Sequence, residues 1–157
     1  MRTTDLHPDL APLAFLVGVW RGEGRGDYPT IAPFSYGEEL TFVDPGRPFL
    51  SYVQRTWSLV DQAPLHAETG YWRMAGPGRV EVMLAHPTGI TELLEGTVEG
   101  HRITLRSTQL VRSSTAKLVE AVERSYWLED GALHSTLGMA AVGQPMQQHL
   151  SALYRRG

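Results

Sequence analysis

Histidines are the residues of this chain best suited to hold a metal ion, because the sequence contains no cysteine. The absence of cysteine excludes disulfides, thiolate metal sites, iron–sulfur clusters and a cysteine nucleophile. A metal must therefore be held by histidine, carboxylate or tyrosine. No two histidines stand in a His-x-His or His-x-x-x-His pattern, so local spacing does not support a zinc site. The six histidines are His7, His66, His86, His101, His134 and His149.

His149 stands apart because it lies within the last predicted strand, residues 147–155. Strict alternation puts it on one face with Ser151 and Leu153. The opposite face also carries apolar residues, so alternation does not decide which face is inside. Spacing alone favours a merely structural histidine here. The same reading holds for His66 and His86, which each sit at a strand end beside apolar residues.

Other catalytic patterns are weak or absent in the sequence. There is no Gly-x-Ser-x-Gly nucleophile elbow. The acidic pair Glu38-Glu39 falls at a strand start and is interpreted as a solvated edge. A dinucleotide site is not indicated either, since the glycines of residues 18–24 do not follow a strand and open a helix.

The run from Gly18 to Gly24 is nevertheless the most informative motif of the chain. Gly18, Gly22 and Gly24 share one face of a predicted strand with Trp20. That face presents one large ring beside bare backbone, so the strand can bend sharply or admit another group very closely. A closing barrel, or a pocket floor for a flat ligand, can use both properties.

The elements that must position these residues are mostly strands. A short helix is expected near the N-terminus, starting at Asp5 or at His7-Pro8 and shortened or kinked by Pro12. Beyond Gly18 the apolar runs are separated by turn signals such as Pro45-Gly46 and Asp130-Gly131. The predicted strands span residues 18–25, 38–43, 49–58, 66–74, 79–86, 90–98, 101–109, 117–128, 132–141 and 147–155. We therefore predict an all-β protein, an antiparallel up-and-down barrel of about ten strands that is wide enough to hold a ligand.

Length and composition indicate one domain over residues 1–157, with a net charge of −3. That balance argues against a nucleic-acid surface, which needs a basic patch. The start of the chain does not resemble a secretory signal, and no apolar run reaches the roughly 18 residues of a membrane span. A cytoplasmic protein is the expectation.

Several blocks of the sequence resemble the bacterial nitrobindins, a family of haem-binding β-barrels related in shape to fatty-acid-binding proteins. The resemblance runs from about His7 to Arg155. The blocks recur in order with family-like spacing, which is far more specific than the glycine motif alone. They are His7-Pro8-Asp9-Leu10, Gly18–Gly24, Tyr28–Ile31, Tyr36–Glu39, Gln54–Trp57, Pro64–Glu68 with Gly70, His86–Gly89, Met139, and Pro145 to Leu150.

The resemblance implies a ten-stranded barrel that binds one haem b per chain at one mouth. It makes His149 the axial iron ligand and gives His66 a catalytic place on the distal side. It also implies that Lys117 contacts the haem, where its ammonium would pair with a propionate. The remaining haem-binding positions implied by the family are Thr30, Gly18, Trp20, Gly22, Gly24, Leu65, His66, His86 and Met139.

The function implied is isomerisation of peroxynitrite to nitrate on ferric haem, with binding of nitric oxide in the ferrous state. One axial imidazole leaves the other face of the iron open to a small anion. Two alternatives stay open: a carrier of a small apolar ligand of the lipocalin or fatty-acid-binding type, and a haem store or sensor without turnover. In a carrier, Arg55, Arg106 or Arg124 would clamp a carboxylate. A homodimer is also left open.

Overall fold

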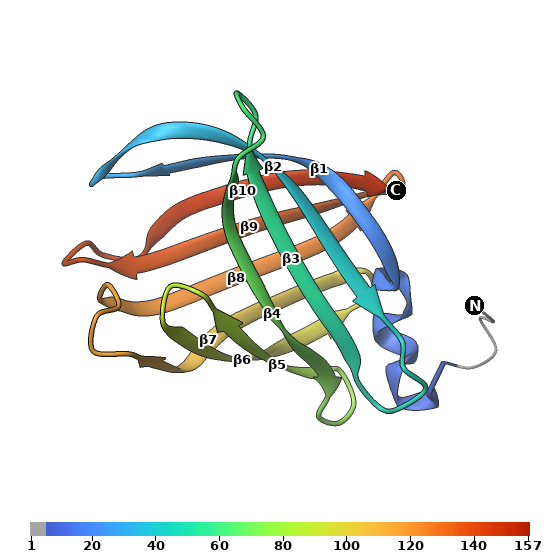
Figure 1. Ribbon diagram of the computed structural model, residues 1–157. Helices are drawn as coiled ribbons and strands as arrows, with labels where there is room; N and C mark the ends of the chain where they lie inside the picture. Colours follow the sequence, from blue (N-terminus) through green and yellow to red (C-terminus); the bar gives the residue numbers. More distant parts are fainter. Residues whose placement is uncertain (1–5) are drawn as a thin grey trace.

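A computed structural model describes residues 6–157 as one closed barrel (Figure 1). Each strand pairs antiparallel with its neighbour in the sequence, and β1 pairs with β10 to close the ring. The predicted all-β barrel and its closure between the first and last strands are confirmed. The elements are η2 (Pro8–Leu16), β1 (Gly18–Tyr28), β2 (Ile31–Val43), β3 (Leu50–Ser58), β4 (Pro64–Met74), β5 (Arg79–His86), β6 (Ile90–Glu99), β7 (Arg102–Arg112), β8 (Val119–Glu129), β9 (Ala132–Ala141) and β10 (Gln147–Arg156).

The largest difference from the predicted strands lies in β2, which begins at Ile31 rather than at residue 38. The early part of this strand contains Pro33, which cannot donate a ladder hydrogen bond. Pairing with β3 starts only at Tyr36, so Pro33 lies where β2 has a neighbour on one side alone. A proline is tolerated at such a free edge.

The short N-terminal helix is a 3₁₀-helix, and Pro12 lies inside it. Leu10, Leu13 and Leu16 are fully buried. Their spacing of three residues matches the three-residue turn of a 3₁₀-helix, so all three lie on one face. Of the two expected starts, Asp5 lies outside the described residues, and the helix begins at Pro8. Within residues 6–157 no helix is both long and apolar enough to cross a membrane.

The helix lies at one end of the barrel, where the apolar core is concentrated (Figure 1). Trp20 is 1% exposed in this core, and its indole nitrogen donates to the carbonyl oxygen of Leu16 at 2.9 Å. Leucines from η2 and aromatic rings from β2, β3 and β4 fill this end. This end of the barrel is therefore packed solid rather than hollow.

Gly22 is the glycine at which close approach is most evident. It pairs with Tyr154 of β10 on one side and with Glu38 of β2 on the other. A side chain at Gly22 would run into the backbone carbonyl of Leu153. At Gly24 it would instead meet the ring of Tyr36. The predicted close approach is confirmed, and the groups that approach belong to the protein itself.

Candidate functional site

The family-implied residues gather at the end of the barrel opposite η2. This end carries the hairpin turns β1–β2, β3–β4, β5–β6, β7–β8 and β9–β10, several of which project to the left in Figure 1. The residues found at these turns or strand ends are Thr30, Leu65, His66, His86, Lys117, Met139 and His149. Seven side chains far apart in the sequence thus surround one mouth. Gly18 and Trp20 lie at the other end, beside η2, while Gly22 and Gly24 lie midway along β1.

A bulge in β10 determines the direction of the His149 side chain. Gln148 pairs with Gly138 and Leu150 pairs with Leu137, so His149 is the extra residue. A bulge turns two consecutive side chains toward the same face, which breaks the strict alternation assumed from the sequence. His149 therefore joins Leu150 rather than Ser151, and its half-buried ring packs edge-on against Tyr28 with centroids 5.2 Å apart.

The His149 ring is anchored through one nitrogen. Nδ1 lies 3.0 Å from the carbonyl oxygen of Asp27. A carbonyl oxygen can only accept, so Nδ1 carries the proton and donates it. The lone pair is then on Nε2. This is the tautomer and the anchoring seen in metal-ligating histidines, in which the second nitrogen is held by a carbonyl or carboxylate.

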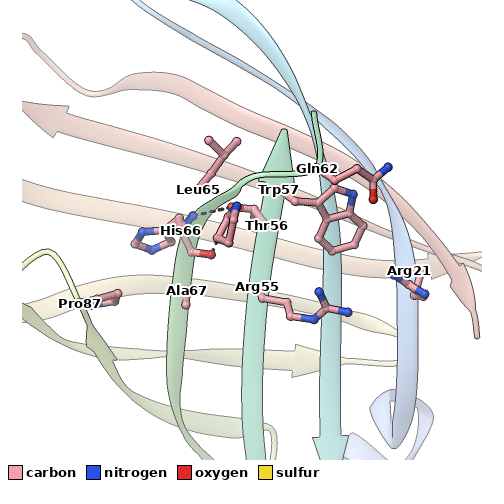
Figure 2. A pocket seen from close by; sticks show the side chains of 10 residues that line it. Arg21, Arg55, Thr56, Trp57, Gln62, Leu65, His66, Ala67 and Pro87 are labelled. Carbon is pink, nitrogen blue, oxygen red and sulfur yellow. Dashed lines mark hydrogen bonds between the residues drawn. The ribbon is translucent and has the colours of Figure 1, made fainter. Parts of the chain in front are cut away.

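The opposite wall of the mouth carries His66 and His86. In the closed ring, β10 and β5 are separated by four strands in either direction, so His149 and His86 belong to opposite walls. His66 Nε2 lies 3.1 Å from His86 Nδ1. The position of His66 is fixed by Thr56, whose hydroxyl accepts from the His66 amide at 2.9 Å and donates to the His66 carbonyl at 3.3 Å (Figure 2). This exchange fills the irregularity in the β3–β4 ladder between Arg55 and Trp57.

A pocket of about 380 Å³ opens beside His66 at the β3–β4 turn (Figure 2). Leu65 is 54% exposed at its rim, whereas the His66 side chain is 34% exposed. Small solutes can therefore reach the His66 ring. The other lining residues are Arg21, Arg55, Thr56, Trp57, Gln62, Pro64, Ala67 and Pro87.

Below the two histidines, Arg124 crosses the barrel interior between two carboxylates. Its Nη1 and Nη2 donate to Glu68 at 2.7 and 3.1 Å. Its Nε and Nη2 donate to Glu92 at 3.1 and 2.9 Å. Glu92 in turn accepts a hydrogen bond from His86 Nε2 at 2.8 Å. All three charged side chains are 5% exposed or less, so this network forms a rigid, dry floor beneath the mouth.

The charges in this network move the pKa values of its members. Burial on its own would raise the pKa of Glu92, but Arg124 and His86 outweigh burial and lower it to about 2. The pKa of Glu68 is lowered in the same way, with Arg124 outweighing burial. Burial lowers the pKa of His66, with the charge of Glu68 opposing it. The two carboxylates are thus ionised and His66 is neutral near pH 7.

Glu38 is also buried, so the prediction of a solvated edge at Glu38-Glu39 is wrong for this residue. Only Glu39 lies outside, where it pairs with Arg21 and Arg55. Glu38 is 7% exposed and accepts from Tyr154 and from Gln54, each at 2.7 Å. Burial raises its pKa to about 7, although both hydrogen bonds act to lower it. Adjacent residues of a strand face opposite sides, so one of the pair had to point inward.

The sequence reasoning did not identify Glu68, Glu92 or Glu38 as interior residues. A signal was available, since each charged side chain shares its face with large apolar neighbours. Glu68 alternates with Gly70 and Trp72, and Glu92 alternates with Leu94. Of the three arginines proposed as a carboxylate clamp, only Arg124 is buried, and its donors are already bound to the protein's own carboxylates. The structure therefore offers no free clamp among the three.

The barrel also opens between β7 and β8. Their ladder runs only from Arg102–Trp127 to Arg106–Glu123, although both strands extend further toward the mouth. The exposed Lys117 lies in the loop that joins them.

The comparisons with known proteins agree with this architecture. The model of the THAP4-like, heme-binding beta-barrel domain matches residues 9–156. The peroxynitrite isomerase of Nocardia farcinica is 52% identical over 155 residues, covering 96% of this chain and 92% of that protein. Peroxynitrite isomerase 2 of Mycobacterium avium is 51% identical, covering 98% of each. The crystal structure of Rv2717c from M. tuberculosis has a TM-score of 0.91 and 47% identity, covering 97% of this chain and 99% of that one.

The closed barrel of ten strands has a helix at one end, and His66, His86 and His149 lie at the other end. This architecture is that of the small ligand-binding β-barrels. Within that class the match over residues 9–156 is specific. The chain belongs to the family of THAP4-like haem-binding β-barrel domains, which confirms the resemblance seen in the sequence.

Proposed function

We propose that this chain binds one haem b through His149 and isomerises peroxynitrite to nitrate. The observation that supports this proposal most directly is the orientation of the His149 ring. Its Nδ1 donates to the Asp27 carbonyl, which leaves the lone pair on Nε2. The names of the relatives, peroxynitrite isomerases at about half identity over nearly the whole length, support the reaction. We also expect the haem-loaded chain to bind nitric oxide.

The residues around the mouth fit a haem. His149 supplies a neutral imidazole whose second nitrogen is held by a carbonyl, which fixes the ring and raises its basicity. Met139, half-buried at the end of β9, and Leu65 supply apolar wall. Lys117 and Thr30, both exposed in turns at the mouth, are suited to the polar edge of the ring, where an ammonium would pair with a propionate.

When bound, haem iron would supply a Lewis-acid and redox centre for rearranging the O–O bond of a small anion. The chain's own contribution lies on the opposite wall. His66 is neutral, half-exposed and held by Thr56, so it can offer or accept a hydrogen bond at a fixed point. His86, backed by Glu92, holds His66 in place.

For the glycine strand we propose a structural role toward haem. Gly18 and Trp20 lie beside η2, while Gly22 leaves room for the backbone of β10 and Gly24 for the ring of Tyr36. These residues would therefore affect haem binding indirectly, by determining the shape of the barrel. A carrier that clamps a carboxylate is disfavoured, because the donors of Arg124 are taken.

Haem titration of the purified full chain tests the ligand assignment. We expect a Soret band in the wild type and in His66→Ala, and its loss or strong weakening in His149→Ala, with unchanged far-ultraviolet circular dichroism in all three. A wild-type Soret band and affinity in His149→Ala would show that another residue holds the iron.

A further inference from the structure

Three ligand atoms on the wall opposite His149 converge within the barrel. His66 Nε2 and His86 Nδ1 are 3.1 Å apart. Glu68 Oε1 lies 3.9 Å from the first and 3.7 Å from the second. The ligand atoms of these three side chains therefore all lie within 4.8 Å of one another.

The size of this triangle matches a transition-metal ion. A point equidistant from three atoms with these separations lies about 2.1 Å from each. Zn–N and Zn–O bonds are about 2.0–2.2 Å long, so an ion would fit between the atoms with little movement of the side chains. Two imidazoles and one carboxylate are also a donor set used for zinc and non-haem iron, with further positions left open.

The surroundings of the triangle are those of a prepared ligand set. Glu92 lies 2.8 Å from His86 Nε2, which places the proton on that nitrogen and leaves the lone pair on Nδ1. His66 Nε2 then donates to His86 Nδ1 at 3.1 Å, and a bound ion would take the place of that proton. Arg124 binds both oxygens of Glu68 and so fixes its orientation. A carboxylate oxygen has two lone pairs, so Glu68 Oε1 can accept from Arg124 and still face the triangle.

Charge balance also favours a cation. The buried network contains two carboxylates, Glu68 and Glu92, and one guanidinium, Arg124. These three side chains together carry a formal charge of −1, which a bound cation would compensate.

We propose that His66, His86 and Glu68 bind a divalent transition-metal ion of the zinc class, separately from the haem ligand His149. The His66 side chain is 34% exposed, which gives the ion a path to the site from solvent. This site lies on β4 and β5, across the barrel from β10, and it does not depend on the proposed isomerase activity.

Calorimetric titration of the full chain without haem, using Zn²⁺, tests the proposal. We expect one ion per chain, and in a parallel titration with Co²⁺ the visible bands of a low-coordinate nitrogen–oxygen site. His66→Gln, His86→Gln and Glu68→Gln should each weaken binding by about 100-fold or more, and Glu92→Gln by roughly 10–100-fold. His134→Gln, whose ring stacks on Trp127 on the outer wall, should bind as the wild type does.

Circular dichroism of each variant separates loss of the site from loss of the fold. Glu68→Gln perturbs the buried Arg124 network, so the two histidine variants decide the matter if Glu68→Gln does not fold. Unchanged Zn²⁺ affinity in His86→Gln, or equal losses in His134→Gln and His86→Gln, would overturn the proposal. Failure here leaves the haem titration of His149→Ala untouched, so the two proposals fail separately.

Discussion

Tyr154 donates a hydrogen bond of 2.7 Å to Glu38 inside the barrel, across the strand that separates them. Both residues pair with Gly22, Tyr154 from β10 and Glu38 from β2. Gly22, which has no side chain, lies between them on β1. This hydrogen bond therefore connects the closure of the barrel, the glycine motif and a buried carboxyl group.

The raised pKa of Glu38 predicts a specific pH dependence of stability. Between its ordinary value of 4.5 and about 7, folded Glu38 holds a proton that the unfolded chain has released. The free energy of unfolding should therefore fall as pH rises through this window, by an amount on the order of 3 kcal/mol. Chemical unfolding at a series of pH values from 4.5 to 8 measures it.

Glu38→Gln is the matched variant for that series. A neutral amide can still accept from Tyr154. Its NH₂ can donate to Gln54 Oε1 once the Gln54 amide flips, and that oxygen has no hydrogen-bond partner among the described residues. We expect the variant to lose the decline between pH 4.5 and 7 and to exceed the wild type in stability at pH 8. A decline as steep in the variant as in the wild type would place its origin elsewhere.

Gly22→Val should damage the fold itself. Its side chain would run into the Leu153 carbonyl and the backbone of Tyr154 in β10. We expect a loss of several kcal/mol or failure to fold, seen in thermal and urea unfolding. Gly138→Ala is the control, because its added carbon would meet first the flexible Met146 sulfur at 3.3 Å. Equal stability of both variants would contradict the role given to Gly22.

Arg124→Met should destabilise the barrel by about 3–5 kcal/mol, because Glu68 and Glu92 would remain buried without their partner. Urea unfolding near pH 7 measures the change. Arg55→Met on the outer face, where Arg55 pairs with the partly exposed Glu39, should cost about 1 kcal/mol or less. Similar losses in the two variants would mean that the interior network contributes no more than a surface pair.

The strands and their closure could be predicted from the sequence because turn residues and alternating apolar runs act locally. The direction of His149 could not, since a bulge adds one residue to β10 and shifts the alternation. Only the resemblance to a family marked this histidine as a ligand. The early part of β2 could not be predicted because it contains Pro33, and a proline is usually excluded from a strand that is paired on both sides. Here this part of the strand has one free edge, so the proline is tolerated.

The buried charged residues were harder to predict from the sequence than the strands. Glu68, Glu92 and Arg124 come from three strands, and each alone would be too costly to bury. Their burial is stable only because all three meet, which is a property of the closed ring rather than of any local pattern. Glu38 was misplaced for the same reason, since its partners Tyr154 and Gln54 lie on other strands.

The decay of peroxynitrite in a stopped-flow instrument, followed with haem-loaded and haem-free protein, tests the proposed activity most directly. The account predicts that only the haem-loaded chain accelerates decay catalytically, gives mainly nitrate and protects free tyrosine from nitration, and that cyanide abolishes the effect. The haem-free chain is the control, because its Met, Tyr and Trp side chains consume peroxynitrite stoichiometrically. Equal protection of tyrosine per mole by the two forms would contradict the isomerase assignment and favour a haem store or a ligand carrier.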